Sequence, residues 1–184
     1  LQLPRMPRRM ECYDISNIRG TAAVGSMVIF EEGRPKPAQY RRFSIKTVIG
    51  INDYAMMQEV LRRRFARGAQ TGETEPGKGW ASTPDLILID GGRGHLNAVL
   101  ATMHEMGIDS VPVASIAKEN EDIFMPGMTH PIVLPRNSQA LYILQRIRDE
   151  AHRFAQHYHH ILRGKRLLGS AGRRPSRSRR RGEN

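Results

Sequence analysis

The chain has 184 residues, enough for one hydrophobic core and too few for two ordinary ones, so we expect a single domain. Lysine and arginine outnumber the acids 29 to 18, and a net charge of +11 favours a polyanionic partner, a nucleic acid or an anionic membrane. No segment approaches the ~20 apolar residues of a membrane span, which favours nucleic acid. One cysteine, Cys12, and no secretory leader predict a cytoplasmic protein.

The two ends of the chain differ in character from its middle. It begins at Leu1 rather than at methionine, so we expect a fragment or a processed protein. From residue 169 to residue 184 the composition turns to Gly, Ser, Pro and Arg, with six arginines set against Glu183. We interpret this segment as a disordered basic tail with a charge of +5, which leaves +6 of the +11 on a folded domain over residues 1–168.

An antiparallel meander opens the predicted fold. Its three strands cover residues 9–14, 22–30 and 39–46, with a turn at 31–35 between the last two. Strand side chains alternate, so Met10, Cys12 and Asp14 share one face of the first strand. Asp14 is therefore expected on an apolar face.

Helices and strands alternate in the rest of the chain. A helix begins at Asp53 as its N-cap, and its buried face is predicted to carry Met57, Val60, Leu61 and Phe65. A loop is predicted over 68–83, a buried strand over 85–90, a helix over 93–106, a strand over 111–117, a short hairpin near Phe124 and Ile132, and a long helix over about 138–163. This order predicts an α/β fold of the RNase H-like type, a mixed sheet of the meander plus parallel strands, flanked by helices.

Two aspartates are the first candidates for chemistry. An ionised Asp14 on an apolar face is costly unless a cation or a donor meets it. Asp90 ends the apolar strand just before two glycines. Each also fits a structural role alone, Asp14 bonding its own strand end and Asp90 acting as a turn residue. As a pair at the carboxyl ends of neighbouring strands, they converge where open α/β sheets place their sites, and carboxylates suit Mg²⁺ or Mn²⁺.

Two further residues are candidates on weaker grounds. His152 lies at the border of the apolar stripe of the last helix, which brings it over the end of the sheet. A histidine satisfied at a helix boundary is the structural alternative. For Asp53, capping its helix is a sufficient explanation without any catalytic role.

Five strings, taken in order, resemble the C-terminal nuclease region of the UvrC family of bacterial excinucleases. They are ECYDIS (11–16), DYAM (53–56), IDGGRG (89–94), LPRNS (134–138) and RIRDEAHRF (146–154). The resemblance covers about residues 10–162. It departs from the family pattern where Arg93-Gly94-His95 replaces Lys-Gly-Gln, where Asn52 replaces an acid, and in a longer loop at 68–83.

The resemblance implies a role in nucleotide excision repair, as the domain that makes the 5′ incision in damaged double-stranded DNA. It implies Asp14, Asp90 and His152 as the catalytic set, Asp53 as a further acid, and UvrB, with UvrA indirectly, as partners of the longer protein. The GIY-YIG nuclease, the UvrB-binding segment and the helix-hairpin-helix region of such proteins are not evident in this sequence. We expect the fragment to be monomeric.

The chemistry expected of such a site is phosphodiester hydrolysis with Mg²⁺ or Mn²⁺ held by Asp14 and Asp90. His152 then ligates a metal or carries a proton. The cut strand has to be held by its backbone, for which the candidates are Arg93, Lys118 and Arg136, with ordinary solvated surface as the alternative.

Two other functions fit the same residues. One is another RNase H-like nuclease, similar to endonuclease V or to a resolvase. The other is a non-catalytic nucleic-acid-binding module in which the carboxylates only cap and turn. A divalent-metal titration separates binding from catalysis, because a binding module shows salt-dependent affinity without cleavage. A lesion substrate presented by UvrB separates the two nucleases.

Overall fold

A mixed β-sheet forms the centre of the structure, a computed structural model that describes residues 1–17, 23–70, 80 and 82–171. Its strands in chain order are β1 (Arg9–Ser16), β2 (Val24–Glu31), β3 (Arg34–Pro35), β4 (Arg41–Ser44), β5 (Leu86–Asp90), β6 (Val113–Ala117) and β7 (Asp122–Phe124). Across the sheet they run β3-β2-β1-β5-β6-β7, and β4 also pairs with β2. The pairs β1–β5 and β5–β6 are parallel, and the others are antiparallel. The predicted RNase H-like fold class is confirmed by this arrangement.

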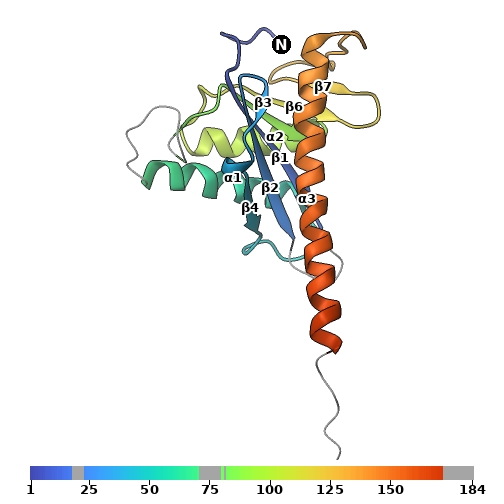
Figure 1. Cartoon of the computed structure of the whole chain (residues 1–184). Coiled ribbons are helices and arrows are strands. Elements are labelled where there is room, and N and C mark those ends of the chain that lie inside the picture. Colours follow the sequence, from blue (N-terminus) through green and yellow to red (C-terminus); the bar gives the residue numbers. More distant parts are fainter. Residues whose placement is uncertain (18–22, 71–79, 81, 172–184) are drawn as a thin grey trace, which may run out of the picture.

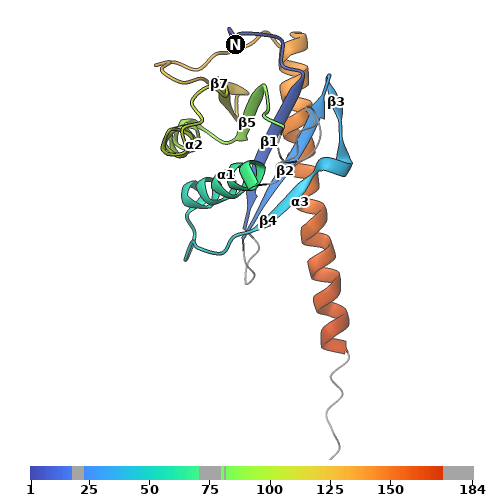
Figure 2. The same ribbon diagram turned by 90° about the vertical axis from the view of Figure 1, so that its left-hand side faces the viewer.

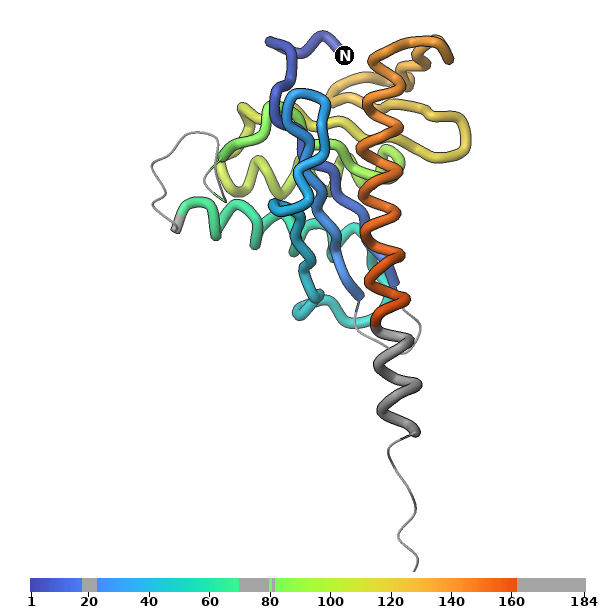
Figure 3. Tube along the Cα trace, viewed as in Figure 1, coloured from blue at the N-terminus to red at the C-terminus, as the bar shows by residue number. Residues whose placement is uncertain are grey.

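Helices cover both faces of the sheet (Figures 1 and 2). They are α1 (Asp53–Gln70), α2 (Arg93–Glu105), α3 (Gln139–Ala171) and the short 3-10 helix η1 (Pro37–Gln39). Figure 2 shows α1 and α2 on one side of the sheet and α3 on the other. The N-terminal segment lies near the beginning of α3 (Figure 3). Leu1 and Leu3 line an apolar pocket there with Ile143. None of the described helices is long and apolar enough to cross a membrane.

Strand alternation divides the hydrophobic core into two clusters. On the α1 and α2 side the sheet buries Tyr13, Ile87 and Ile89 against α1. The predicted buried face of α1 is confirmed, since Met57, Val60 and Leu61 are fully buried and Phe65 is partly buried. On the α3 side the apolar rows of the sheet pack against Leu144, Ile147 and Ala151. The sheet is therefore covered on both faces, as the apolar run of β5 predicts.

Several predicted boundaries are wrong. The turn expected at 31–35 is only two residues long, Glu32 and Gly33, both at positive φ (50° and 73°), because β2 continues through Glu31 and β3 follows at once. Helix α3 ends at Ala171 rather than near residue 163. Residues 71–79, 81 and 172–184, with most of the predicted loop and tail, lie outside the described part of the chain.

A buried charged cluster, which was not predicted from the sequence, links α1 to β1. Arg64 on α1 and Glu11 on β1 are 1% and 0% exposed, and Arg64 Nη2 donates to Glu11 Oε1 at 2.8 Å. The Tyr13 hydroxyl donates to the other carboxylate oxygen at 2.5 Å, and Arg64 also donates to the carbonyls of Trp80 and Ser82. Burial, reinforced by Glu11, raises the pKa of Tyr13 well above its usual value.

Candidate active site

The two predicted aspartates lie side by side at the ends of parallel strands. Asp14 is near the end of β1, and Asp90 is the last residue of β5. The register pairs Cys12 with Leu88, and its continuation by two residues sets Asp14 beside Asp90 on the same face. The preceding rows on this face are apolar and pack beneath α3. The acid pair therefore begins where the apolar core of the α3 face ends.

Helix α3 brings His152 to the acid pair. One ligand atom from each of Asp14, Asp90 and His152 lies within 4.8 Å of the other two. His152 Nδ1 lies 3.3 Å from Asp14 Oδ2. The Asp14 side chain is 10% exposed and that of His152 is 44% exposed, so the cluster opens to solvent on the histidine side. The three residues of the predicted catalytic set thus come together from three separate elements.

The surroundings of the acid pair disfavour ionisation of Asp14. Burial raises the pKa of Asp14, and the neighbouring Asp90 carboxylate raises it further, while Lys118 and His152 act in the opposite direction. The ammonium of Lys118, just after β6, lies 3.1 Å from Asp90 Oδ2 and 3.4 Å from His152 Nδ1. A positive group of the protein therefore sits against two of the three donors.

The Nδ1 atom of His152 has two competing neighbours. Its Nδ1 faces the Asp14 carboxylate, to which it donates when protonated, and the Lys118 ammonium, from which it accepts when it is not. Its Nε2 lies 2.8 Å from the side-chain nitrogen of Gln156, one helical turn later. An imidazole with a carboxylate and an ammonium at the same nitrogen is suited to exchange a proton or to offer a lone pair to a metal.

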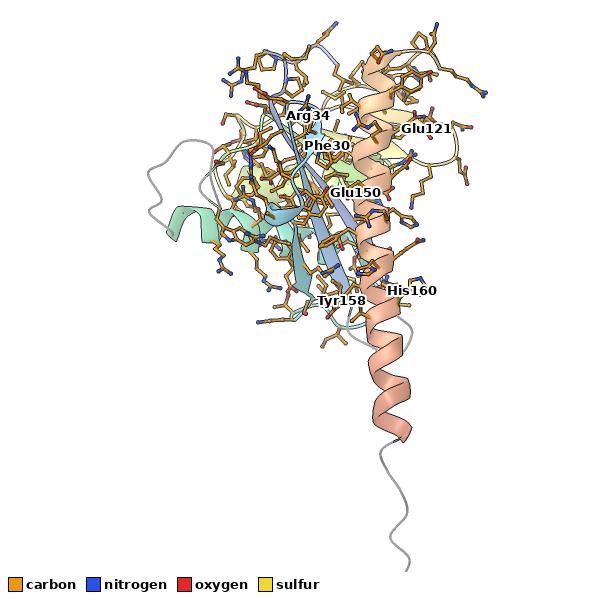
Figure 4. All side chains as sticks on the ribbon, in the orientation of Figure 1. Phe30, Arg34, Glu121, Glu150, Tyr158 and His160 are labelled. Atoms are coloured by element: carbon orange, nitrogen blue, oxygen red, sulfur yellow. The ribbon has the colours of Figure 1, made fainter. Side chains whose placement is uncertain are left out.

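Polar contacts along α3 fix the position of His152. Arg148, one turn earlier, is ion-paired with Glu121 in the turn before β7. Glu150 accepts a hydrogen bond from the Tyr40 hydroxyl at 3.0 Å. Figure 4 shows Glu150 on the flank of α3 that faces β2 and β4, with Glu121 on the other side. The helix is held from both flanks, which limits its rotation and hence the movement of the histidine.

Asp53 does not have the capping role that the sequence predicted. The cap is Asn52, whose side-chain oxygen accepts from the Ala55 amide at 3.0 Å, and Asp53 is the first residue of α1. Its carboxylate accepts instead from the Asn17 amide at 2.7 Å. Asp53 is not one of the three clustered residues.

A second histidine links Asp53 to the site, and sequence reasoning missed its role. His95, in the first turn of α2, packs edge-on against Tyr54 with ring centroids 4.7 Å apart. Burial lowers the pKa of His95, while Asp53 and Asp90 oppose this shift, so the imidazole lies within the field of both acids. It stands over Gly91, where a Cβ would come within 2.6 Å of the ring. The available signal was its place in the helical turn that follows Asp90.

The three predicted phosphate contacts differ in their surroundings. Lys118 is in the cluster itself, paired with Asp90. Arg93 donates to the Thr129 carbonyl at 2.5 Å and lies over the Phe124 ring. Arg136 is exposed in the loop before α3. Only Lys118 among them touches the clustered residues in the described part of the chain.

The donor set fits a divalent cation. Two carboxylates and one imidazole are oxygen and nitrogen donors of the kind that Mg²⁺ and Mn²⁺ accept, with Mn²⁺ more tolerant of nitrogen. Burial and then the Asp90 carboxylate raise the pKa of Asp14, and the Lys118 ammonium acts in the opposite direction. A bound cation relieves the same repulsion.

Comparison with known proteins gives one family over most of the chain. The family described as "UvrC RNAse H endonuclease domain" matches residues 1–156. Proteins named UvrABC system protein C are 54% identical over 165 residues in Moorella thermoacetica, 52% over 171 in Dehalococcoides mccartyi and 46% over 165 in Methanosphaera stadtmanae. These alignments cover 90%, 93% and 90% of the chain but only 26%, 27% and 27% of the relatives. The chain thus spans about a quarter of their length.

Solved structures with weaker similarity are endonucleases V. A Ciona intestinalis endonuclease V in complex with a 24mer DNA containing an inosine gives a TM-score of 0.41 at 13% identity, over 61% of this chain and 46% of that chain. Human ENDOV gives 0.39 at 11% identity, over 83% of this chain and 86% of that chain.

Proposed function

Because the chain belongs to the family of UvrC RNase H endonuclease domains, we propose that it is a divalent-metal-dependent DNA endonuclease that makes the 5′ incision during nucleotide excision repair. The observation that carries this proposal is the convergence of Asp14, Asp90 and His152 within 4.8 Å. The substrate is damaged double-stranded DNA in the cytoplasm. UvrB, and UvrA through it, act as partners by way of parts of the longer protein.

The proposed chemistry is hydrolysis of one phosphodiester bond. Asp14 and Asp90 hold Mg²⁺ or Mn²⁺, with His152 as a further ligand or as a proton carrier. When bound, the ion supplies positive charge at the scissile phosphate and lowers the pKa of an attacking water. Water forms the new P–O bond, the bond to the 3′ oxygen breaks, and that oxygen takes up a proton. The products carry a 5′-phosphate and a 3′-hydroxyl.

Residues around the cluster have supporting tasks in this proposal. With an ion held by Asp14 and Asp90, the Lys118 ammonium, which contacts Asp90, would be available to hold a phosphate oxygen. Arg93 and Arg136 hold the backbone further out. Asp53 acts on the site through His95, whose imidazole interacts electrostatically with both Asp53 and Asp90.

The test is cleavage by matched carboxylate variants. Asp14→Asn and Asp90→Asn are expected to lose more than about a hundredfold in cleavage rate, because each removes a proposed metal ligand. Asp109→Asn is the control, since this aspartate is 63% exposed and is paired with His104. The substrate is a duplex with one defined lesion, presented with UvrB, in Mg²⁺ or Mn²⁺. Wild-type cleavage by either ligand variant contradicts the assigned site, and metal-independent binding without cleavage favours a binding module.

A further inference from the structure

Two consecutive arginines project from opposite faces of an edge strand. β4 pairs with β2 alone among the described strands, so its other edge is open. Arg41 lies beside Met27, which faces α1, and Arg42 lies beside Ser26, which faces α3. Because the strand is at the edge of the sheet, both guanidinium groups reach the same border of the molecule.

Aromatic rings, rather than an acid, hold Arg42. Its guanidinium carbon lies 3.7 Å from the centroid of the Phe154 ring and 4.9 Å from that of Tyr158. Its Nη2 donates to the Phe154 carbonyl at 3.3 Å. Figure 4 shows Tyr158 on the flank of α3 that faces β4. These contacts orient the planar group and leave other N–H donors directed to solvent.

Arg41 is held in the same manner on the other face. Its guanidinium lies over the Trp80 ring, 5.4 Å from the centroid. Its Nη1 donates to the carbonyls of Ala38 and Tyr40 at 3.0 and 2.8 Å. The side chain is thereby fixed without neutralisation of its charge.

Arg41 and Arg42 differ from the arginines that the structure places in ion pairs. Other arginines of the described residues, among them Arg9, Arg148 and Arg153, form ion pairs with carboxylates. Over the same residues neither Arg41 nor Arg42 has a carboxylate within ion-pair distance. Partial burial lowers the pKa of Arg42, but an arginine stays charged. Two oriented cations without an acidic partner, on an open edge of the sheet, are suited to bind a polyanion whose negative charges are evenly spaced.

Helix α3 separates this border from the acid pair. Successive helical residues turn by about 100°, so His152 and Phe154 emerge on opposite flanks of α3. Arg42 is two strands from Asp14 in the sheet register, about 10 Å at the usual strand spacing. A phosphate held by Arg42 is therefore not the one that is cut.

We infer that Arg41 and Arg42 form a second contact site for the phosphate backbone of duplex DNA, on the far side of α3 from the cleaved bond. The inference rests on the proposed function for its ligand, DNA, but it concerns binding and not the chemistry. The site holds the duplex while the acid pair acts. Loss of these contacts weakens substrate binding and leaves the chemical step intact.

The experiment measures binding of the whole chain to a labelled DNA duplex in EDTA, over a series of salt concentrations. Each phosphate contact contributes about 0.9 to the slope of log affinity against log salt, so Arg41→Gln with Arg42→Gln lowers the slope by about 1.8. Arg62→Gln is the matched control, because Arg62 is an exposed arginine on α1 that is paired with Glu105. It is expected to leave the slope unchanged. Arg41→Lys with Arg42→Lys keeps the charge and most of the slope.

A methylphosphonate scan then locates the contact. Neutral linkages at one or two positions away from the cut weaken binding of the wild-type chain and have no effect on the variant that combines Arg41→Gln with Arg42→Gln. In cleavage assays Arg42→Gln raises KM and leaves kcat unchanged. An unchanged slope in the double variant, an equal loss in Arg62→Gln, or the same methylphosphonate profile in both proteins overturns the inference. Binding without cleavage contradicts the proposed function alone, and cleavage with an unchanged slope contradicts only this site.

Discussion

Replacement of Asp14 by asparagine is expected to stabilise the metal-free protein while it abolishes activity. Burial and then the Asp90 carboxylate raise the pKa of Asp14 in the folded state above the unfolded value of about 3.9. The stability contributed by this group is thus fully present below pH ~3.9 and is lost as the pH rises through the folded pKa. At pH 7 the ionised Asp14 opposes folding, and asparagine removes that opposition.

The size of the effect follows from the separation of the donors. Two unit charges 4.8 Å apart, the limit of the cluster, repel by about 3.5 kcal/mol at an effective dielectric constant of about 20. Lys118 and His152 offset part of this repulsion. We therefore expect a gain of about 1–2 kcal/mol, or a rise in Tm of about 2–8 °C for a chain of this length.

The assay is thermal unfolding followed by circular dichroism in EDTA, at pH 7 and near pH 3. Asp85→Asn is the matched control with the opposite sign. Burial opposes ionisation of Asp85, but hydrogen bonds from the amides of Arg9 and Arg8 and from the Arg5 side chain outweigh it and lower the pKa of Asp85. Its stabilising contribution is present at pH 7 and is lost as the pH falls through the folded pKa, so asparagine costs stability there.

Divalent ions narrow the difference in stability between the two proteins. The wild-type chain gains about 1.4 kcal/mol at a metal concentration ten times the Kd, whereas Asp14→Asn lacks a ligand and gains less. The reasoning is refuted if Asp14→Asn melts at or below the wild-type temperature at pH 7 in EDTA. It is also refuted if its advantage persists near pH 3, or if Mn²⁺ stabilises both proteins equally.

Three further predictions concern other parts of the molecule. His152→Ala is expected to lower the cleavage rate about 10²- to 10⁴-fold, and His152→Asp is expected to retain more activity. The wild-type chain should cleave faster in Mn²⁺ than in Mg²⁺. If kinetic assays give wild-type rates for His152→Ala, the residue has only a structural role. Arg64→Met leaves Glu11 buried without its main partner and is expected to lower the free energy of unfolding in urea by about 3–5 kcal/mol. Adding Glu11→Leu should recover most of this loss. An Arg64→Met variant as stable as the wild type contradicts the prediction. Removal of residues 172–184, with their six arginines, lowers the salt slope of DNA binding by up to about 5 without changing sequence preference; an unchanged slope excludes the tail from binding.

The positions of the two aspartates could be predicted because a short-range pattern fixes them. Alternation in β1 puts Asp14 on the same face as Cys12, and the apolar run of β5 ends at Asp90. Parallel neighbours end at the same edge of a sheet, so fold class and acid pair follow together. His152 followed from its helical phase relative to the buried stripe that contains Ala151.

The missed features depend on which elements come together. Asn52 and Asp53 are both good caps, and only the backbone conformation decides that the first one caps α1. Arg64 falls in the apolar phase of α1, but its burial requires Glu11 on another element. His95 gains its place only because α1 and α2 begin beside each other. None of these is encoded in a local pattern.

The assembly of the site links its activity to the docking of α3. Asp14 and Asp90 belong to paired central strands, but His152 reaches them only while α3 lies on the sheet. The same helix supplies Phe154 and Tyr158 to the arginine on β4. A change that loosens α3 without touching these residues should therefore weaken metal binding and duplex binding together. A change in Arg42 alone should weaken only the second, and this difference separates a local contact from a loss of docking.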